Sequence, residues 1–249
     1  MKAASFLVRG RRGFATHSQP LKELLNHDPT QVAQMKDMMT LVDENDNVVG
    51  PISKLEGHLR GRTQLPHRAF SLLLFNSRFE MLLQRRSPKK ITFPGLWTNA
   101  CCSHNSHEAH ELQAAPEFIG MRRAAVRRAK FELGIEELDP ECDLRVGARI
   151  LYKADSCETF AEHELDYIIF CVKDLTLWTP AHVNKDEVDS VAWVSRADLD
   201  GFLDTERARD GADITPWFRL LKNTKLHAWW AAIEQGRFPS ESERIIRFL

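Results

Sequence analysis

The stretch FIGMRRAAVRRAKFELGI, residues 118–135, decides the fold class. Its apolar residues recur every three or four positions, which is the period of a helix that buries one face, and Gly134 supplies a stop near its end. The sequence on either side of this helix reads as β-strands, so the apolar face has a sheet to pack against. The sequence therefore predicts an α+β fold, in which helices pack on a mixed β-sheet.

Apolar runs separated by turn residues predict the strands. MTLVDENDNVVG at 39–50 and RAFSLLLFNSRFEMLLQRR at 68–86 each read as an antiparallel hairpin, the second broken at Asn76 and Ser77. Further strands are expected at 144–152, 165–172 and 188–194.

Two more helices are expected after the last of these strands. Ser195 begins SRAD, which resembles a capping box and predicts the start of a short helix. Thr215 and Pro216 are a cap residue and a first-turn proline, and they open a helix that should run to about Gly236.

The composition is that of an ordinary globular chain, with 249 residues of which 43% are hydrophobic and 28% charged. We expect a single domain over residues 23–249, because a chain of this length can bury roughly 70 to 75% of its unfolded surface. The 34 basic and 35 acidic residues leave a net charge of -1, which argues against a nucleic-acid partner. No apolar run approaches the roughly 18 to 20 residues that span a bilayer. Nothing in the sequence marks an oligomeric interface.

The first 22 residues resemble a targeting segment. They include Arg9, Arg11 and Arg12, and no acidic residue precedes Glu23. A basic, acid-free start is typical of a mitochondrial transit peptide, so we expect a mitochondrial location, with cytosol or peroxisome as alternatives. An unstructured basic tail would have the same composition.

The segment PGLWTNACCSH, residues 94–104, is the densest candidate for chemistry. Side chains two positions apart share one face of an extended chain, so Cys102 and His104 should point together while Cys101 points away. A thiol and an imidazole could then meet at one site. The alternative is a buried structural cysteine beside a surface histidine.

A second candidate is ETFAEHELDY at 158–167, where Glu162 and Glu164 have the same spacing just before an apolar strand. Two carboxylates on one face repel each other unless they share a cation or a proton, so they suggest a metal site or an acid/base pair. His58 and His67 lie upstream and could join His104 around the same divalent ion. A solvated edge strand is the alternative.

Basic residues form a third candidate. QRRSPKK at 84–90 follows a strand and could grip a phosphate-bearing ligand, although such a run is more often a solvated turn. In the helix, Arg128 and Glu132 lie one turn apart, where a carboxylate could hold a magnesium ion that phosphates also ligate. A surface ion pair is the alternative.

Five segments in order, HRAFSLLLFN, ITFPGLWTNACCSH, RRAAVRRAKFELGI, AEHELDY and ITPWF, resemble the type I isopentenyl diphosphate isomerases of the Nudix superfold. The resemblance runs from about residue 40 to 235. It implies a Nudix-type mixed β-sheet sandwiched between helices, with N- and C-terminal extensions. It also implies interconversion of isopentenyl and dimethylallyl diphosphate, small-molecule substrates of isoprenoid biosynthesis.

The resemblance also implies roles for individual residues. Cys102 matches the family's catalytic cysteine and Glu164 its catalytic glutamate, while Tyr152 and Trp217 resemble the active-site tyrosine and the cation-facing tryptophan. Protonation of the alkene by Glu164, with Tyr152 in relay, would give a tertiary carbocation, and Cys102 would take a proton from it as a thiolate. Trp217 would stabilise the cation.

Metal and diphosphate positions are implied in the same way. The positions that match the family's metal ligands are His58, His67, His104, Glu162 and Glu164, for Mg²⁺, Mn²⁺ or Zn²⁺. Those that resemble its diphosphate-binding positions are Lys54, Arg86, Lys90 and Arg128. Glu132 matches the carboxylate of a second, diphosphate-linked Mg²⁺.

The helix departs from the Nudix hydrolase pattern. A hydrolase box reads REUxEExGU, whereas residues 127–135 read RRAKFELGI, so two of the three glutamates are replaced by Arg128 and Phe131. We therefore expect the fold to bind a diphosphate without cleaving it. A Nudix diphosphohydrolase and a non-catalytic diphosphate-binding module are the alternative functions.

Overall fold

The computed structural model describes residues 24–62 and 64–248, and the predicted targeting segment at 1–22 lies outside them. The strands are β1 (Met38–Val42), β2 (Val48–Ser53), β3 (His67–Phe75), β4 (Met81–Arg86), β5 (Trp97–Asn99), β6 (Cys101–His104), β7 (Leu144–Asp155), β8 (Ala161–Val172), β9 (Val188–Val194) and β10 (Ile245–Phe248). The α-helices are α2 (Pro29–Gln34), α3 (Lys54–His58), α4 (Ala109–Leu112), α5 (Ile119–Leu133), α6 (Leu199–Asp210), α7 (Pro216–Thr224) and α8 (Leu226–Glu234), and Pro180–His182 form a 3-10 turn.

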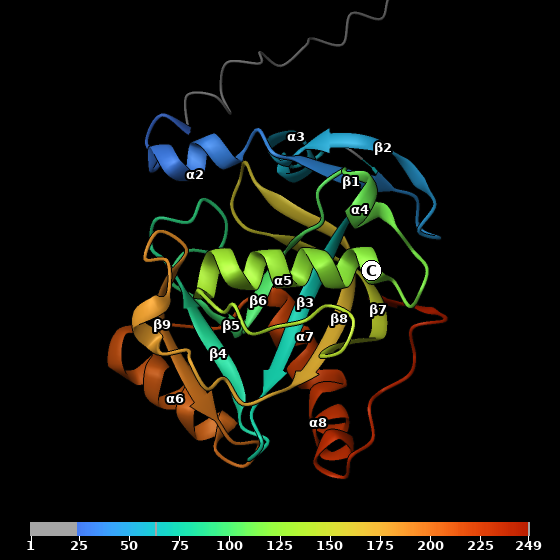
Figure 1. Ribbon diagram of the computed structural model, residues 1–249. Coiled ribbons are helices and arrows are strands. Elements are labelled where there is room, and N and C mark those ends of the chain that lie inside the picture. Colours follow the sequence, from blue (N-terminus) through green and yellow to red (C-terminus); the bar gives the residue numbers. More distant parts are fainter. Residues whose placement is uncertain (1–23, 63, 249) are drawn as a thin grey trace, which may run out of the picture.

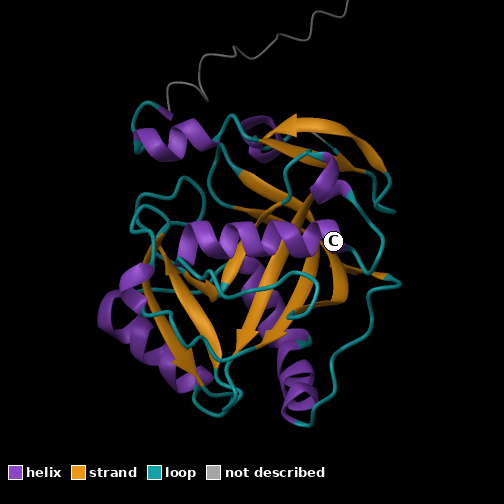
Figure 2. Ribbon diagram, viewed as in Figure 1, coloured by secondary structure: helices purple, strands orange, loops and turns teal. Residues whose placement is uncertain are grey.

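Helices cover both faces of one mixed sheet, as Figures 1 and 2 show. The apolar stripe of α5, which includes Met121, Ala125 and Leu133, packs on one face in a fully buried cluster. The helices α6, α7 and α8 build a second cluster on the other face. The predicted α+β sandwich of Nudix type is confirmed.

The centre of the sheet brings the candidate residues together. Strand β3 is buried along its whole length and pairs parallel with β8 and antiparallel with β6. In this register His67 lies opposite Glu164, Ser71 lies opposite Cys102, and Ala69 lies opposite His104. The thiol, the imidazoles of His67 and His104, and the two carboxylates therefore come from three adjacent strands, and His58 joins them from α3.

Two strand predictions need correction. The strand expected at 165–172 begins at Ala161, so Glu162 and Glu164 lie inside a buried central strand and not on a solvated edge. Polar residues are tolerated there because histidines from α3, β3 and β6 contact them. The hairpin expected at 68–86 is paired only at its turn, where Phe75 of β3 lies opposite Met81 of β4. Beyond that pair, β4 forms its ladders with β5 and β9.

Two helix predictions also differ. The helix expected from Ser195 begins at Leu199, because Ser195 and Asp198 bond each other in a turn before it. The helix expected from Thr215 to Gly236 is two helices, α7 and α8, which separate where the backbone of Lys225 leaves the helical region at φ -124 and ψ -33. The division of the chain at residue 22 stays a prediction.

None of the helices within the described residues combines the length and the apolar character that crossing a bilayer requires.

Candidate active site

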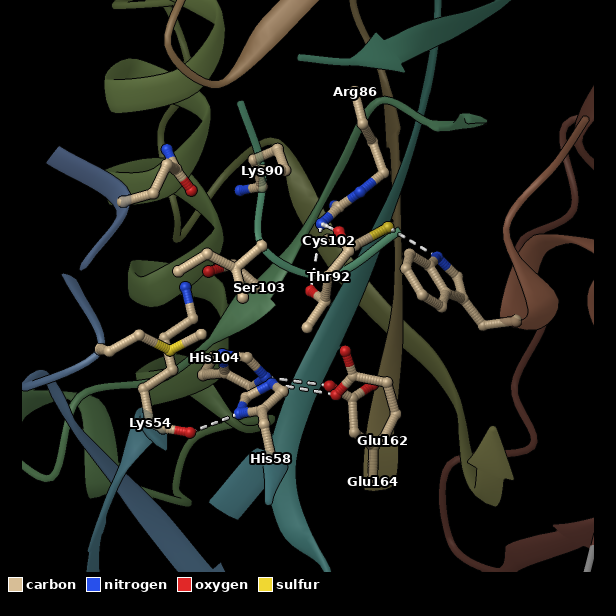
Figure 3. Close-up of a pocket in the computed structure, with 14 residues that line it drawn as sticks. Lys54, His58, Arg86, Lys90, Thr92, Cys102, Ser103, His104, Glu162 and Glu164 are labelled. Atoms are coloured by element: carbon tan, nitrogen blue, oxygen red, sulfur yellow. Dashed lines mark hydrogen bonds and ion pairs between the residues drawn. The ribbon is translucent and has the colours of Figure 1, made fainter. Parts of the chain in front are cut away.

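One cavity gathers most of the predicted site residues, and Figure 3 shows it in close-up. Those that line it are Lys54, His58, Arg86, Lys90, Cys102, His104, Glu162, Glu164 and Trp217. In this view Cys102 lies near Arg86 at one end of the cavity, and the carboxylates lie with His58 at the other. The cavity thus has a thiol end and a histidine–carboxylate end.

The histidine–carboxylate end is a compact donor cluster of His58, His67, His104, Glu162 and Glu164. One ligand atom from each of the five residues lies within 4.8 Å of the others, and the three imidazole rings are 4.8 to 5.0 Å apart. His58 Nε2 is 2.9 Å from Glu162 Oε2, and His104 Nε2 is 2.9 Å from Glu164 Oε1. All five residues predicted to share one ion are therefore brought together, and Glu132, predicted to hold a second ion, lies outside this cluster.

The donor cluster fits a divalent ion. His67 is fully buried, and none of the described residues forms a hydrogen bond with either of its ring nitrogens, although Glu164 Oε1 lies 3.5 Å from Nε2. Buried nitrogens without a bond are costly unless another partner supplies the contact. Nδ1 of His58 lies 2.6 Å from the carbonyl oxygen of Lys54, which orients the ring with Nε2 toward the cluster. Burial and the neighbouring His67 hold the pKa of His104 well below its usual value, so this ring stays neutral, as a ligand must be.

At the thiol end, polar groups surround Cys102. Its Sγ lies 3.0 Å from Asn99 Oδ1 and accepts a hydrogen bond of 3.0 Å from Trp217 Nε1. Burial, with Asp166 next, raises the pKa of the Cys102 thiol to about 12. The sulfur is thus a protonated thiol in the substrate-free protein, and it must lose this proton before it can act as the thiolate that the resemblance implies.

Tyr152 is not among the lining residues of the cavity, but it contacts Glu164, which is. Its phenol donates a short hydrogen bond to Glu164 Oε2. Burial and this carboxylate hold the pKa of Tyr152 well above its usual value, so the phenol keeps its proton. Asp166, two residues further along the same face of β8, accepts a hydrogen bond of 2.8 Å from Ser71 Oγ. Burial and Glu164 hold the pKa of Asp166 far above normal.

Three cations, Lys54, Arg86 and Lys90, line the cavity. Arg86 uses Nε and one terminal nitrogen to bond the carbonyls of Phe93 and Thr92, at 2.9 and 2.8 Å. Burial, with Lys90 and Arg128 next, lowers the pKa of Lys54 to about 7. Arg86 and Lys90 are buried, so the solvated-turn interpretation is wrong for these two residues, whereas Lys89 is exposed and pairs with Asp186.

Arg128 and Glu132 lie beside the cavity. Arg128 donates to Glu132 Oε1 at 2.6 Å and lines an adjoining hollow that shares Lys54 with the main cavity. The Glu132 carboxylate is buried and also accepts a 3.3 Å bond from Gln84. The pair is therefore internal and not a surface ion pair, and Glu132 is not among the described residues that form the cavity wall.

Two polar residues of the site, Glu187 and Asp166, are not among those predicted from the sequence. Glu187 lies 2.5 Å from Lys90 Nζ and 3.7 Å from Arg128, and these cations outweigh burial and lower its pKa to about 2. No local pattern marks Glu187, which comes from a loop far along the chain. Asp166 could have been found, because it continues the two-residue spacing of Glu162 and Glu164.

Comparisons with known proteins agree with this geometry. The NUDIX domain family matches residues 65–218. The chain is 43% identical over 206 residues to "Isopentenyl-diphosphate Delta-isomerase I" of Camptotheca acuminata, covering 81% of this chain and 86% of that protein. It is 41% identical over 224 residues to "Isopentenyl-diphosphate Delta-isomerase 1" of Bos taurus, covering 88% and 96%. A Clarkia breweri relative of the first name is 44% identical over 206 residues, covering 81% and 70%. On this similarity the chain belongs to the isopentenyl-diphosphate Delta-isomerase family of the Nudix superfamily.

Proposed function

We propose that this protein interconverts isopentenyl and dimethylallyl diphosphate, the activity for which its relatives are named. The observation that carries the proposal is one cavity that holds a thiol, a carboxylate backed by a phenol, and three cations. Moving a double bond by one carbon requires a proton to be added at one position and another removed two carbons away. The cavity supplies a group for each step.

Glu164 and Cys102 are the proton-transfer groups in this account. Glu164 accepts a hydrogen bond from Tyr152, so a proton can move between the phenol and the carboxylate without reaching solvent. Cys102 exchanges a proton at the other reacting carbon. The pair holds one exchangeable proton. In the substrate-free protein this proton is on the Cys102 sulfur, from which it can protonate dimethylallyl diphosphate. For isopentenyl diphosphate to react, the proton must instead be on Glu164.

Trp217 and the cavity walls protect the intermediate. A tertiary carbocation reacts with water to give an alcohol, so the reacting carbons must be dry. Trp217 is 4% exposed and its indole bonds the Cys102 sulfur, which puts an aromatic ring beside the reacting atoms. A desolvated aromatic face contributes roughly 2 kcal/mol or more toward a cation.

The diphosphate is held by Lys54, Arg86, Lys90 and Arg128. This grip supplies the binding energy that fixes a small hydrocarbon tail between the proton-transfer groups. A Mg²⁺ ion bound by Glu132 would neutralise part of the diphosphate charge there. A divalent ion, Mg²⁺, Mn²⁺ or Zn²⁺, held by the donor cluster would polarise Glu164 and raise its acid strength.

A hydrolase is the second candidate, because the chain carries a NUDIX domain and keeps Glu132 of the hydrolase box. Arg128 and Phe131 stand where a hydrolase needs glutamates, and Arg128 is bonded to the remaining Glu132. A purely diphosphate-binding module would have no use for Cys102 and Glu164. Incubation with isopentenyl diphosphate and Mg²⁺ separates the three: dimethylallyl diphosphate, free phosphate, or unchanged substrate.

We also propose a mitochondrial location, from the arginine-bearing, acid-free residues 1–22. A fusion of residues 1–30 to a fluorescent reporter should enter mitochondria. Diffuse cytosolic signal from the fusion, or peroxisomal signal from the full chain, would contradict this.

A further inference from the structure

Asn99 has a side chain whose orientation is fixed by the backbone. It ends β5, is fully buried, and its Nδ2 donates to the carbonyls of Leu72 and Cys101 at 3.1 and 3.2 Å. An amide bound in this way cannot flip without losing both bonds. Its Oδ1 must therefore face Cys102, whose Sγ lies 3.0 Å away and donates to it.

Thr98 links this amide to the helix that carries Trp217. The Thr98 hydroxyl lies 3.1 Å from Asn99 Oδ1 and 3.6 Å from Cys102 Sγ, and it accepts a 2.9 Å bond from Thr215 Oγ1. Thr215 precedes α7, but its hydroxyl does not cap that helix and donates its hydrogen bond to Thr98 instead. Thr98 and Thr215 are both fully buried, so no water competes for these bonds.

The sulfur of Cys102 is thus held from two sides. Its proton points to Asn99, and Trp217 Nε1 donates to the sulfur at 3.0 Å. The hydroxyls of Thr98 and Ser71 lie at 3.6 and 3.8 Å from it. Because Cys102 also lines the cavity, the direction left open on the sulfur is the one that faces the cavity. Proton transfer to or from carbon depends steeply on such alignment.

We propose that Asn99 and Thr98 are positioning residues that hold the Cys102 sulfur in place, so that rotation about its Cβ–Sγ bond moves the S–H proton between Asn99 Oδ1 and the reacting carbon. This inference rests on the proposed isomerase function. Neither residue reaches the diphosphate-binding cations, so their loss should slow the chemical step and leave substrate binding intact. The expected signature is a fall in kcat with little change in KM.

Matched variants separate positioning from general destabilisation. N99A should lower kcat about tenfold or more, the scale of one lost directional hydrogen bond, with KM within about threefold. N105A is the control, because Asn105 is an equally buried asparagine whose Nδ2 bonds Thr40 and Ser106 and which has no bond to Cys102. N105A should keep kcat within about threefold even where its Tm falls as far as that of N99A.

Thr98 gives a second pair that keeps the test decisive if N99A does not fold. T98V removes the hydroxyl at constant shape and should lower kcat about tenfold, while T98S should restore it to within about threefold. Parental kcat in T98V, or a kcat loss that N105A and T98S share, would overturn the proposal. Failure of the proposed function itself is distinct, because the parent would then form no dimethylallyl diphosphate.

Discussion

Cys101 and Cys102 are consecutive residues of β6, yet their side chains lie on opposite faces of the sheet. Cys101 is fully buried in the cluster under α5, whereas Cys102 packs toward the helices of the other face and lines the cavity. Strand alternation alone produces this difference. The two thiols are therefore a natural pair of test and control.

We predict that C102A loses isomerase activity by about 10² or more, the scale of one positioned acid or base. C101A should stay within a few-fold of the parent, because its thiol never meets the substrate. Initial rates of dimethylallyl diphosphate formation measure both. If C101A were the inactive variant, the face assignment and the role of Cys102 would both be wrong.

The chain has two tyrosines, and each donates to a buried carboxylate. Tyr152 bonds Glu164 at the cavity, whereas Tyr167 bonds Asp46 on the other side of the sheet. Y152F should lower kcat by about 10², because the proton relay to Glu164 is lost. Y167F should cost stability but leave kcat near the parental value. Equal kcat values for the two variants would remove Tyr152 from the mechanism.

The lowered pKa of Lys54 predicts how the affinity for substrate depends on pH. Burial disfavours its charged form, and its pKa of about 7 means that the substrate-free protein carries this cation below pH 7 and loses it above. Because a diphosphate needs the cation, KM should rise as pH increases from 7 to 9. K54R, whose guanidinium stays charged, should show a flat KM over that range. A rising KM in K54R would assign the effect to another group.

The donor cluster predicts a stable divalent-ion site. H67N should lower bound divalent metal, measured by elemental analysis, and weaken metal affinity by at least about 10- to 100-fold, which is the cost of removing even an outer-shell partner. The control is H163N, because His163 is buried like His67 but belongs to β8 and is not one of the five donors of the cluster. Equal metal content in H67N and the parent would mean that the five donors are not ligands.

Glu132 predicts the magnesium requirement of catalysis. E132Q should raise the Mg²⁺ concentration that gives half-maximal rate, because the carboxylate that would hold the diphosphate-linked ion is gone. Glu136, exposed just beyond the same helix and paired with Lys130 at 3.1 Å, provides the control E136Q. Identical Mg²⁺ dependence in E132Q and E136Q would show that Glu132 serves only its bond to Arg128.

Much of this site was predictable because local periodicity reports which side chains share a face. The two-residue spacing of Cys102 and His104, and of Glu162 and Glu164, holds in β6 and β8. The helix period places the apolar stripe of α5 on the sheet as expected. Patterns of this kind depend only on the backbone geometry of one segment.

Other features depend on contacts between distant segments, and periodicity carries no information about them. Glu187 reaches Lys90 from 97 positions away, and Thr215 reaches Thr98 from 117. The early start of β8 was missed because a charged residue is read as exposed unless its partner is known. The residues alone left a shared ion at the His and Glu donors as one of two interpretations, beside a solvated edge strand, and only the family resemblance favoured the shared ion.

The central claim is that the cavity moves protons on carbon and leaves the diphosphate intact. The most direct measurement is the reaction of isopentenyl diphosphate with the parent protein and Mg²⁺ in deuterated water, followed by proton and phosphorus NMR. The account predicts dimethylallyl diphosphate with deuterium in its new methyl group and no inorganic phosphate. In C102A, both the dimethylallyl diphosphate and its deuterium label should be lost. Release of phosphate from a substrate whose double bond has not moved and has taken up no deuterium would contradict it.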